Sequence, residues 1–512
     1  MRLLIWHGWL LEGAGSNVYT ARVTDVLRRR GHDVLLLCQE GHPERYDFLD
    51  AWGNVGAEGV SNLSEGGAKP ADGHATLLRP DIGGLLPVFV YDEYEGFEVK
   101  RFVDLTNAEL RTYLERNVAA LHAASEWHEA DAVIAGHAIP GPVIARRATG
   151  DGRYVAKIHG SDLEYAVRLQ ERYRRLAAEG LAGARAVVGA SADVLSRTVE
   201  LVPEAGGRTM VVNPGVDVGR FRPRDGASAL SSAADLLSRD SSAEAGRPLS
   251  IDEAVRNALQ ARDQEALDRL ALGYDQDVPD PDAVKKLREL ASQPGPMVGY
   301  IGKFIPQKGV QLLLGALALA KARPRALLIG FGLWREWLTA LLLALDAGDA
   351  EAVAWLDGQV DEPIRLPTDA VRGATGLAGR VIFTGRLDHR YAPEALASLD
   401  VLVVPSILDE AFAMVAAEGA AAGALPLVAR HSGLAEVAAV LEREVGAPGL
   451  FSFEPGPGAA QRLAHGLDRL LELPQDERAE LRRKASAAVN REWTWERTAE
   501  RLLAAADEGS VG

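Results

Sequence analysis

The chain has 512 residues, of which 47% are hydrophobic and 25% are charged, as is ordinary for a globular protein of two or three domains. Its formal net charge of -16 repels polyanions, so the composition argues against a nucleic-acid partner and against nonspecific attachment to an acidic membrane. Local basic patches leave peripheral membrane contact open. The single cysteine, Cys38, ends an apolar run and excludes an internal disulfide framework, which favours a reducing compartment.

The N-terminal residues, MRLLIWHGWLLEGAGSN, contain no long apolar segment with a cleavage site, so we interpret them as a first strand and not as a signal peptide. Nowhere does an uncharged apolar stretch reach the roughly 18 residues that a membrane-spanning helix requires. Together with the lone cysteine, these features predict a cytoplasmic protein without a transmembrane segment.

Residues 1–222 alternate short apolar runs with longer helical patterns, which is typical of a parallel sheet covered by helices. RLLIWH is the first predicted strand, GAGSN is a glycine turn, and a helix over 16–30 has Ser16 as its N-cap. A Gly-rich polar stretch fills 51–84, and a long helix starts near Asn107. Further strands are predicted for HDVLLLC, PVFVYD, DAVIAG, YVAKIHG and ARAVVGAS.

Residues 223–294 differ in character, because acidic residues outnumber basic ones and serine is abundant. SALSSAADLLSRDSSAEAG predicts a partly flexible linker, and SIDEAVRNALQARDQEALDRL predicts two or so helices with a capping box of Ser250 and Glu253. The simpler interpretation is a tolerated surface insertion, since lengthening a loop costs little free energy. A lid over a ligand site is the alternative.

Strands and helices alternate again over residues 295–480, which predicts a second open α/β domain. The predicted strands are MVGYIGKF, RALLIGFG, RVIFTGR, DVLVVPS and ALPLVAR. Within the last segment, residues 481–512, the pattern REWTWERTAERLLAAADE predicts one amphipathic helix with Trp493 and Trp495 near its start.

Several polar residues follow the predicted strands, and ligands of open parallel sheets bind at the carboxyl ends of the strands. GAGS follows the first strand, where its backbone amides can hold an anion, although a simple turn explains it equally well. Lys303 and Lys308 lie in the loop IGKFIPQKG. Two ammonium groups in one loop suit a diphosphate whose negative charge grows as it leaves. The alternative is that both lysines are merely solvated.

Glu410 and Glu418 bracket the start of a predicted helix in DEAFAMVAAEG. An isolated pair of glutamates is usually exposed. Here, however, the first amides of the helix, from Ala411 through Val415, are free to donate hydrogen bonds. A carboxylate beside vicinal hydroxyls can accept two hydrogen bonds, as acidic residues do when they hold ribose. The arrangement therefore predicts a site for a sugar nucleotide.

His159 follows the strand YVAKI and precedes Gly160, a position from which it can contact a reacting group. His137, at the end of DAVIAGH, is placed similarly. A single histidine is more often structural, so both interpretations remain.

Taken together, these segments resemble the GT-B glycosyltransferases, specifically the retaining family 4 type. The segments that carry the resemblance are RRRGHDVLLL, VVNPGVDVGRFRP, VGYIGKFIPQKGVQLLLGAL and PSILDEAFAMVAAEGAAAGALPLVARHSGLAEV, which contains an E-x7-E signature. The resemblance implies a GT-B fold of two Rossmann-like, doubly wound domains that face each other across a cleft, with a helical insertion between them. Residues 1–222 would bind the acceptor, 295–480 the donor, and the C-terminal helix would pack towards the first domain.

The resemblance also implies roles for individual residues. Lys303 and Lys308 would hold the donor diphosphate, Glu410 the hydroxyls of the transferred sugar, and Glu418 the ribose. His159 would contact the donor sugar close to the reacting carbon, so the implied catalytic residues are His159, Lys308 and Glu410. The remaining implied donor contacts are Gly15 and Ser16 in the first domain, Arg386 and Leu387 near the base, and the stretch Ala411, Phe412, Ala413, Met414 and Val415.

Three positions depart from the family pattern. Lys303 stands where the family usually has arginine. A guanidinium that can make two parallel hydrogen bonds is thus replaced by a single ammonium group. Ser432 and Gly433 stand in place of a paired glycine ahead of Glu436, and Gly419 puts a glycine inside a helix directly after Glu418. None of these changes removes an implied ligand.

The function implied is transfer of a hexosyl group, with retention, from a UDP- or GDP-hexose to a hydroxyl of a small-molecule or glycan acceptor. The nucleotide sugar is a co-substrate, and neither a cofactor nor a metal is required. The alternatives are a GT-B sugar phosphorylase, a nucleotide-sugar epimerase, or a non-catalytic protein that binds nucleotide sugars. The base, the hexose, the acceptor, the oligomeric state and the role of residues 225–290 stay open at this point.

Overall fold

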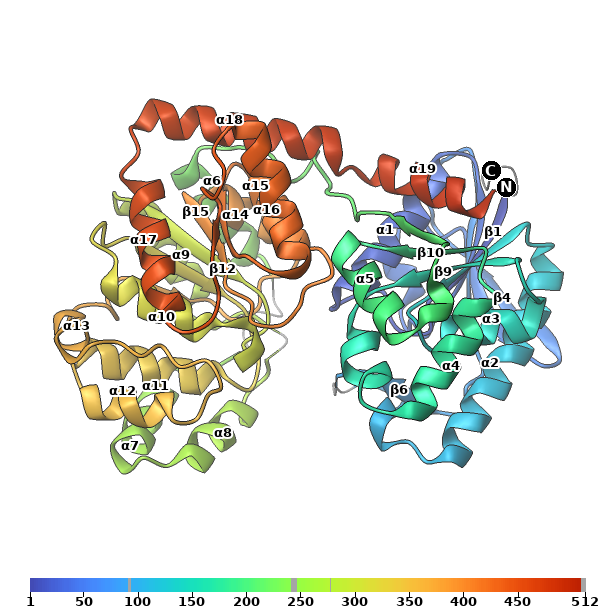
Figure 1. Cartoon of the computed structure of the whole chain (residues 1–512), viewed down its shortest axis with the longest axis horizontal. Helices are drawn as coiled ribbons and strands as arrows, with labels where there is room; N and C mark the ends of the chain where they lie inside the picture. Colours follow the sequence, from blue (N-terminus) through green and yellow to red (C-terminus); the bar gives the residue numbers. More distant parts are fainter. Residues whose placement is uncertain (91–93, 241–245, 277, 508–512) are drawn as a thin grey trace. The chain divides into compact units, whose positions relative to one another are not determined.

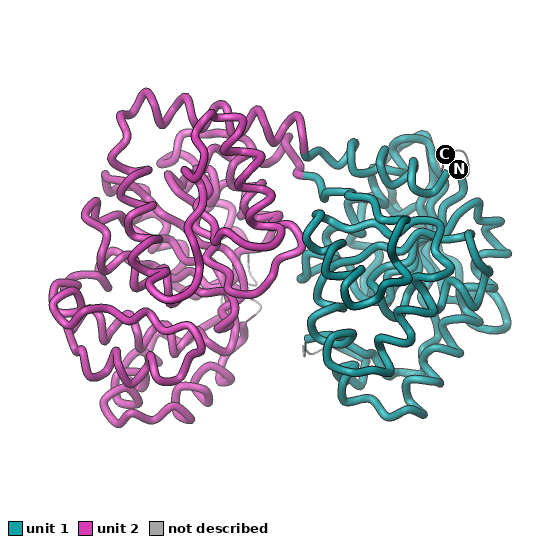
Figure 2. The backbone as a smooth tube through the Cα atoms, in the orientation of Figure 1, with its two compact units in different colours: residues 1–215, 493–512 teal, residues 216–492 magenta. Residues whose placement is uncertain are grey.

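The computed structural model describes residues 1–90, 94–240, 246–276 and 278–507. It divides the chain into two compact units, coloured separately in Figure 2. Unit 1 comprises Met1–Gly215 and Trp493–Gly512, and unit 2 comprises Val216–Glu492. The chain therefore passes from one unit to the other twice. Parts of three predicted segments lie outside the described residues: the end of PVFVYD, two short pieces of the insertion, and residues 508–512.

Unit 1 is built on a nine-stranded sheet with the order β11-β10-β9-β8-β1-β2-β5-β3-β4. All pairs are parallel except the hairpin of β3 and β4. The predictions of a parallel α/β sheet and of its buried strands are confirmed. In chain order the strands are β1 (Arg2–Trp6), β2 (Asp33–Leu37), β3 (Ala51–Gly56), β4 (Gly59–Glu65), β5 (Ala75–Pro80), β8 (Ala132–Gly136), β9 (Tyr154–Ile158), β10 (Ala186–Gly189) and β11 (Thr209–Val211).

Two stretches of unit 1 differ from the prediction. The polar stretch 51–84 contains β3, β4 and β5; most of β4 is exposed on both faces, so it shows no alternation of apolar and polar residues. PVFVYD is only partly a strand, because β6 (Leu85–Val88) ends before Phe89 and pairs with β7 (Glu98–Arg101) in a separate small sheet. Cys38, directly after β2, is buried as expected, and burial raises the pKa of its thiol to about 12.

The helices of unit 1 cover its sheet (Figure 1). They are α1 (Gly15–Arg29), α2 (Asn107–His128), α3 (Gly141–Thr149), α4 (Glu171–Ala182), α5 (Ala192–Leu201) and α19 (Trp495–Ala506), with short turns η1 (Pro43–Arg45), η2 (Phe102–Asp104), η3 (Leu163–Val167) and η4 (Pro203–Ala205). The predicted start of α2 is confirmed. Ser16 is not the N-cap of α1: that residue is Ala14, which makes no side-chain cap.

Unit 2 is built on a six-stranded parallel sheet with the order β14-β13-β12-β15-β16-β17. The five predicted strands are confirmed as β12 (Met297–Ile301), β13 (Arg325–Ile329), β14 (Val381–Phe383), β15 (Val401–Val404) and β16 (Leu425–Ala429); β17 (Ser452–Phe453) is too short to show a pattern. Its helices are η6 (Pro306–Lys308), α10 (Val310–Leu319), α11 (Arg335–Asp346), α12 (Ala350–Asp357), α13 (Thr368–Gly373), α14 (Ala392–Ala397), α15 (Met414–Ala422), α16 (Ser432–Val445), α17 (Ala459–Leu471) and α18 (Gln475–Glu492).

The insertion belongs to unit 2, and its described residues form the helices α6 (Gly226–Leu237), α7 (Ile251–Ala261), α8 (Gln264–Leu272) and α9 (Ala283–Ser292). The linker prediction is wrong for 226–237, because α6 packs against α9 and α14 (Figure 1). Its buried residues Leu230, Ala233, Ala234 and Leu237 follow helical spacing, but small alanines make a weak signal. The capping box is also wrong, because the Ser250 side chain makes no cap.

The predicted C-terminal helix is two helices. α18 ends at Glu492 in unit 2, and α19 begins at Trp495 in unit 1. Thr494 caps α19 by accepting a hydrogen bond from the Arg497 amide at 3.3 Å. The Trp495 ring contacts Tyr19 of α1 with 5.8 Å between ring centroids, which seats α19 on unit 1. None of the helices in the described part of the chain combines the length and the apolar composition needed to cross a membrane.

Candidate functional site

The loop between β12 and α10 is shaped by a glycine. Gly309 has a φ of 68°, and a Cβ built on it would lie 2.0 Å from the carbonyl oxygen of Pro405 in the loop after β15. Only glycine permits this approach of two backbones. The contact brings Lys308, at the end of η6, beside Glu410, although the two residues are far apart in the sequence.

Lys308 and Glu410 form an ion pair through Nζ and Oε1. The Ser406 hydroxyl donates to the same carboxylate oxygen at 2.7 Å. Burial opposes ionisation of Glu410, but the charge of Lys308 and the hydrogen bonds from Lys308 and Ser406 outweigh it and hold the pKa of the carboxyl below its ordinary value. The Glu410 carboxyl is therefore ionised at neutral pH. The side chains of Lys308 and Glu410 remain 27% and 19% exposed, so a ligand can reach them.

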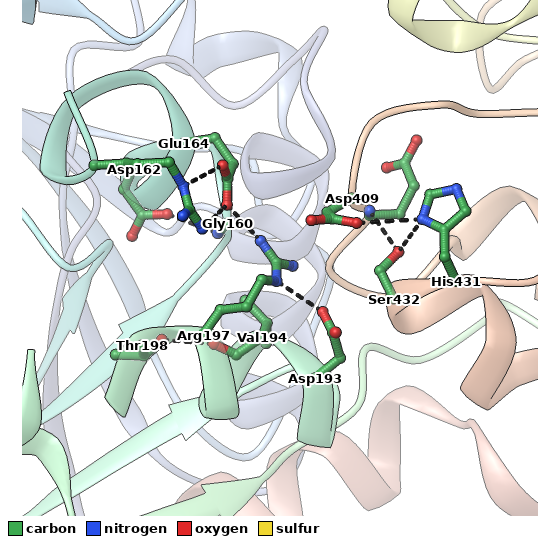
Figure 3. A network of polar contacts seen from close by, with 12 residues as sticks. Gly160, Asp162, Glu164, Asp193, Val194, Arg197, Thr198, Asp409, His431 and Ser432 are labelled. Atoms are coloured by element: carbon green, nitrogen blue, oxygen red, sulfur yellow. Dashed lines mark hydrogen bonds and ion pairs between the residues drawn. The ribbon is translucent and has the colours of Figure 1, made fainter. Parts of the chain in front are cut away.

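The backbone around Glu410 is held by the start of α16. The Glu410 amide donates to the Ser432 hydroxyl at 2.9 Å, and the Gly433 amide donates to the Glu410 carbonyl at 3.0 Å. A Cβ at Gly433 would lie 2.6 Å from the carbonyl carbon of Ala411. His431 Nδ1 lies 3.2 Å from Asp409 Oδ1, a contact drawn in Figure 3. Where the family has a paired glycine, Gly433 keeps the close approach and Ser432 adds a hydrogen bond.

α15 begins at Met414, a few residues after Glu410, so of the amides predicted for the helix start only those of Met414 and Val415 lie in the helix. Its N-cap, Ala413, has a left-handed φ of 75°. The first amides of a helix have no hydrogen-bond partner within the helix, so the start of α15 is the positive end of the helix dipole. One turn further, Glu418 is buried, and its Oε1 lies 3.8 Å from His389 Nε2. Gly419 is explained by packing, because a Cβ there would lie 2.4 Å from Leu402 Cδ2 of β15.

Lys303 and Arg386 meet at one aromatic ring. Lys303 Nζ lies 5.5 Å and Arg386 Cζ lies 5.1 Å from the centroid of Phe331. These residues follow β12, β14 and β13, so three neighbouring strands supply the cluster at their carboxyl ends. Leu387, next to Arg386, is buried. The sequence analysis missed Phe331, although its place in GFG directly after a strand is a usable signal.

In unit 1, His159 lies in a cluster of rings at the ends of β1, β8 and β9. The His159 ring is 4.5 Å from His137 and 5.6 Å from Tyr19, between centroids, and His137 is 4.4 Å from Trp9. Asp162 is fully buried and accepts hydrogen bonds from the amides of Ala138 and Gly160, the second at 2.6 Å. This carboxylate holds the turn that carries His159; Asp162 and Gly160 are labelled in Figure 3.

Burial favours the neutral form of the histidines in this cluster. Burial, with the charges of neighbouring cluster members, lowers the pKa of His159 and of His137 well below the ordinary value. Burial also lowers the pKa of His7 to about 4. Lys157 lies on β9, with Nζ 4.9 Å from the Tyr19 ring, and burial lowers its pKa to about 7 against the charge of Asp162. The sequence analysis missed Lys157, which has the pattern of an ordinary strand residue.

Gly15 and Ser16 open α1 directly after the β1 loop, so their amides belong to a helix start. Unit 1 therefore contains His159, Gly15 and Ser16 of the predicted site residues. Unit 2 contains all the others, and it brings Lys308, Glu410 and the start of α15 together.

Two family models match the chain. Glycosyltransferase Family 4 matches residues 13–220, and Glycosyl transferases group 1 matches residues 285–488. The first covers most of unit 1, and the second covers most of unit 2 outside α6, α7 and α8.

Two curated relatives match parts of the chain. The 2-deoxystreptamine glucosyltransferase of Streptomyces kanamyceticus is 28% identical over 211 residues, or 41% of this chain and 43% of the relative. The 2-deoxystreptamine N-acetyl-D-glucosaminyltransferase of Streptomyces fradiae is 30% identical over 131 residues, or 25% of each chain. The matched segments thus span less than half the length of either relative.

Solved structures match almost the whole chain. The sucrose-phosphate synthase of Thermosynechococcus elongatus has a TM-score of 0.57 at 16% identity, with 98% of this chain and 97% of that chain covered. Anabaena HepE in complex with UDP and glucose has a TM-score of 0.56 at 16% identity, with 98% of each chain covered. At this identity the likeness shows the fold. With the two family models, it shows that the chain belongs to the GT-B glycosyltransferases of the family 4 type.

Proposed function

We propose that the protein transfers a hexosyl group from a nucleoside-diphosphate sugar to a hydroxyl acceptor, with retention at the anomeric carbon. The observation that carries this proposal is the Lys308–Glu410 ion pair at the start of α15. An ammonium group and free helix amides suit a diphosphate, and a charged, partly exposed carboxylate suits sugar hydroxyls.

In the proposed reaction, Lys308, Lys303 and the first amides of α15 bind the donor diphosphate. The bond from the anomeric carbon to the phosphate oxygen breaks, and the negative charge that develops on the diphosphate is stabilised by these groups. The acceptor oxygen forms its new bond on the same face, and its proton passes to the departing phosphate oxygen. The two ammonium groups supply the positive charge that this step requires, so we propose a reaction that needs no metal.

Glu410 and Glu418 would orient the donor. Glu410 would accept hydrogen bonds from hydroxyls of the transferred sugar, with Ser406 and Lys308 fixing the direction of its carboxylate. Glu418 would accept from the ribose, while Arg386 and Leu387 would lie beside the base, with the backbone from Ala411 to Val415 along the sugar and phosphates. UDP is the favoured nucleotide, because the structurally similar HepE was solved with UDP and glucose.

Unit 1 would supply His159 as a neutral hydrogen-bonding partner of the sugar, and Gly15 and Ser16 as amide donors. A neutral imidazole both donates and accepts, which suits a hydroxyl. We expect a small hydroxyl-bearing acceptor, because both curated relatives are named for transfer to 2-deoxystreptamine. We also propose a cytoplasmic location, since the only thiol, Cys38, is buried and unreactive.

A thermal-shift screen of UDP, GDP and ADP tests the donor site. A nucleotide at 100 times its Kd should add about 2.7 kcal/mol to the free energy of unfolding. The Lys308→Ala variant should show no such shift. NMR of the glycoside formed from the matching α-linked hexose donor should show an α-linkage, and a β-linked product would contradict retention.

The same assays separate the alternatives. A phosphorylase would require inorganic phosphate and no nucleotide, and an epimerase would convert the donor without an acceptor. A binding protein would show the thermal shift with no donor hydrolysis over long incubation.

A further inference from the structure

The loop that leaves β14, residues 384–391, is in contact with the insertion at both of its ends. This loop carries Arg386 and Leu387, which the proposed function places beside the nucleoside base, and His389, which faces the proposed ribose ligand Glu418 at 3.8 Å. The inference below rests on that proposed function.

At the start of the loop, the insertion pairs with the edge of the sheet. The Asp280 amide donates to the Thr384 carbonyl at 2.8 Å, and Pro279 forms an antiparallel bridge with Gly385. Gly385 has a φ of 71°, and a Cβ there would lie 2.6 Å from the Asp280 amide nitrogen. Lys286 of α9 donates to the Phe383 carbonyl at 3.0 Å. The insertion thus covers the exposed backbone of the edge strand β14.

Asp280 is itself held firmly. Its carboxylate is buried, and Oδ2 accepts a hydrogen bond from Arg335 of α11 at 3.1 Å. The Arg335 guanidinium lies over the Phe383 ring, with Cζ 3.9 Å from the centroid. Beside it, Arg247 of the insertion pairs with the buried Glu336 at 2.6 Å. Buried ion pairs demand close geometry, so they position the parts that they join.

At the end of the loop, one carboxylate oxygen of Asp240, which belongs to the insertion, contacts two side chains of the loop. The Tyr391 hydroxyl donates to Asp240 Oδ2 at 2.5 Å, and Arg390 Nη1 lies 3.0 Å from the same oxygen. Arg390 also pairs with Asp388 within the loop at 2.7 Å. Between these contacts, the His389 carbonyl accepts from Arg220 at 2.7 Å. The backbone between Thr384 and Tyr391 is therefore fixed at both ends by residues from outside it.

We propose that the insertion is the frame that positions the nucleoside end of the donor site, with Asp240 and Asp280 as positioning residues for the 384–391 loop. A tolerated surface insertion would not bury charged pairs against the sheet edge or close a backbone bridge onto the loop. The diphosphate end of the site is built from other elements, η6 and the start of α15. Affinity for the nucleoside should therefore depend on the insertion, and affinity for the diphosphate should not.

The test compares two ligands on the full chain by isothermal titration calorimetry: UDP, with GDP and ADP alongside, and inorganic pyrophosphate. Asp240→Ala is the first variant, because Arg390 keeps Asp388 as its partner and no charge is left buried alone. We expect its Kd for the preferred nucleoside diphosphate to rise about tenfold, as for a lost hydrogen bond to a charged group. The Kd for pyrophosphate should stay unchanged.

Asp235→Ala is the matched control. It removes an aspartate from the same insertion, but its ion pair with Arg288 at 3.0 Å joins α6 to α9 and does not reach the loop. This variant should bind both ligands as the wild type does. Tyr391→Phe removes the same hydrogen bond from the loop side, and its effect should not add to that of Asp240→Ala.

Each outcome decides the matter. Unchanged nucleotide affinity in both Asp240→Ala and Tyr391→Phe would overturn the inference while leaving the proposed function intact. Equal weakening of nucleotide and pyrophosphate would also overturn it, because a general loosening of unit 2 would then be the cause. A wild-type protein that binds none of the nucleotides would overturn the proposed function, and the inference with it.

Discussion

The titratable side chains at the strand ends are mainly charged in unit 2 and mainly neutral in unit 1. In unit 2, Lys308 and Glu410 are paired, and the pKa of Glu410 is held below its ordinary value, so the edge of the sheet carries full charges. In unit 1, burial lowers the pKa values of His7, His137 and His159, and that of Lys157 falls to about 7. The same architectural position is ionic in one unit and almost neutral in the other.

This contrast shows that one fold can present two different kinds of surface at its strand ends. Partly exposed ion pairs with a helix start suit a ligand that brings its own charge, whereas neutral imidazoles among aromatic rings suit a ligand rich in hydroxyls. Burial contributes to this difference, because Lys157 of unit 1 is buried whereas the side chain of Lys308 in unit 2 is 27% exposed. Four variants test how far the contrast holds.

The largest effect is expected for Lys308→Ala in the ionic edge. Removing the ammonium group takes away one of the groups that would stabilise the developing charge of the diphosphate, and turnover should fall by about 10³-fold. Donor consumption in the presence of acceptor measures this. Lys321→Ala, an exposed lysine of the same unit, is the control and should keep full turnover. Comparable rates in the two variants would place the ionic edge outside the reaction.

Gly309→Ala should destabilise unit 2 while unit 1 stays intact. The new Cβ would strike the Pro405 carbonyl and would force a left-handed φ on alanine, at a cost of about 3 kcal/mol. Hydrogen exchange read out by mass spectrometry locates the loss. Gly373→Ala is the control, since a Cβ there meets nothing within 4 Å. Equally faster hydrogen exchange in both units would contradict the expectation that the two units are stabilised independently of each other.

Lys157→Met tests the neutral edge through the pH dependence of stability. The pKa of Lys157 is about 7 in the folded chain against 10.5 ordinarily, so between these values the unfolded chain binds more protons and stability rises with pH. From pH 7 to pH 9 this rise should amount to about 2 kcal/mol in the wild type. Urea unfolding of both proteins measures it. If Lys157→Met shows the same rise in the free energy of unfolding with pH as the wild type, Lys157 is not the source of that rise and the prediction is wrong.

The smallest effect is expected for Thr494→Ala, at the second crossing between the units. Loss of the helix cap of α19 should cost about 1 kcal/mol, all of it in unit 1. Thermal unfolding measures the change, and Thr494→Ser, which keeps the hydroxyl, should retain the wild-type midpoint. A loss of stability in unit 2 would contradict this prediction, because α19 would then also stabilise the unit on which it does not pack.

The fold could be predicted from the sequence wherever the signal was local. Buried parallel strands are continuous apolar runs, and β1, β2, β8, β9, β10 and β12 to β16 were found for that reason, whereas β3, β5, β11 and β17 were not predicted. Loops after strands gave Lys303, Lys308 and Glu410, because their residue types and positions suit the proposed chemistry. β4 was missed because it is polar and exposed, and α6 because alanine is a weak apolar marker.

Other features depend on contacts between distant segments. Lys157 has a lowered pKa because it is buried, with its ammonium group over the Tyr19 ring of α1, and no pattern around KIHG predicts that. Likewise, Asp240 and Asp280 belong to an acidic stretch that has the pattern of a solvated face. Their role comes from Tyr391, Thr384 and Arg335, which lie far away in the sequence.

Because the chain passes between the two units twice, it also determines the order in which the units can fold during synthesis. The part of unit 1 that ends at Gly215 leaves the ribosome long before α19, and the whole of unit 2 is translated between them. Until then, Tyr19 lacks Trp495, and Gly215, where a Cβ would lie 2.3 Å from the Trp495 amide nitrogen, lacks this close neighbour. A nascent chain of this protein therefore carries an unfinished first lobe, and α19 closes it last.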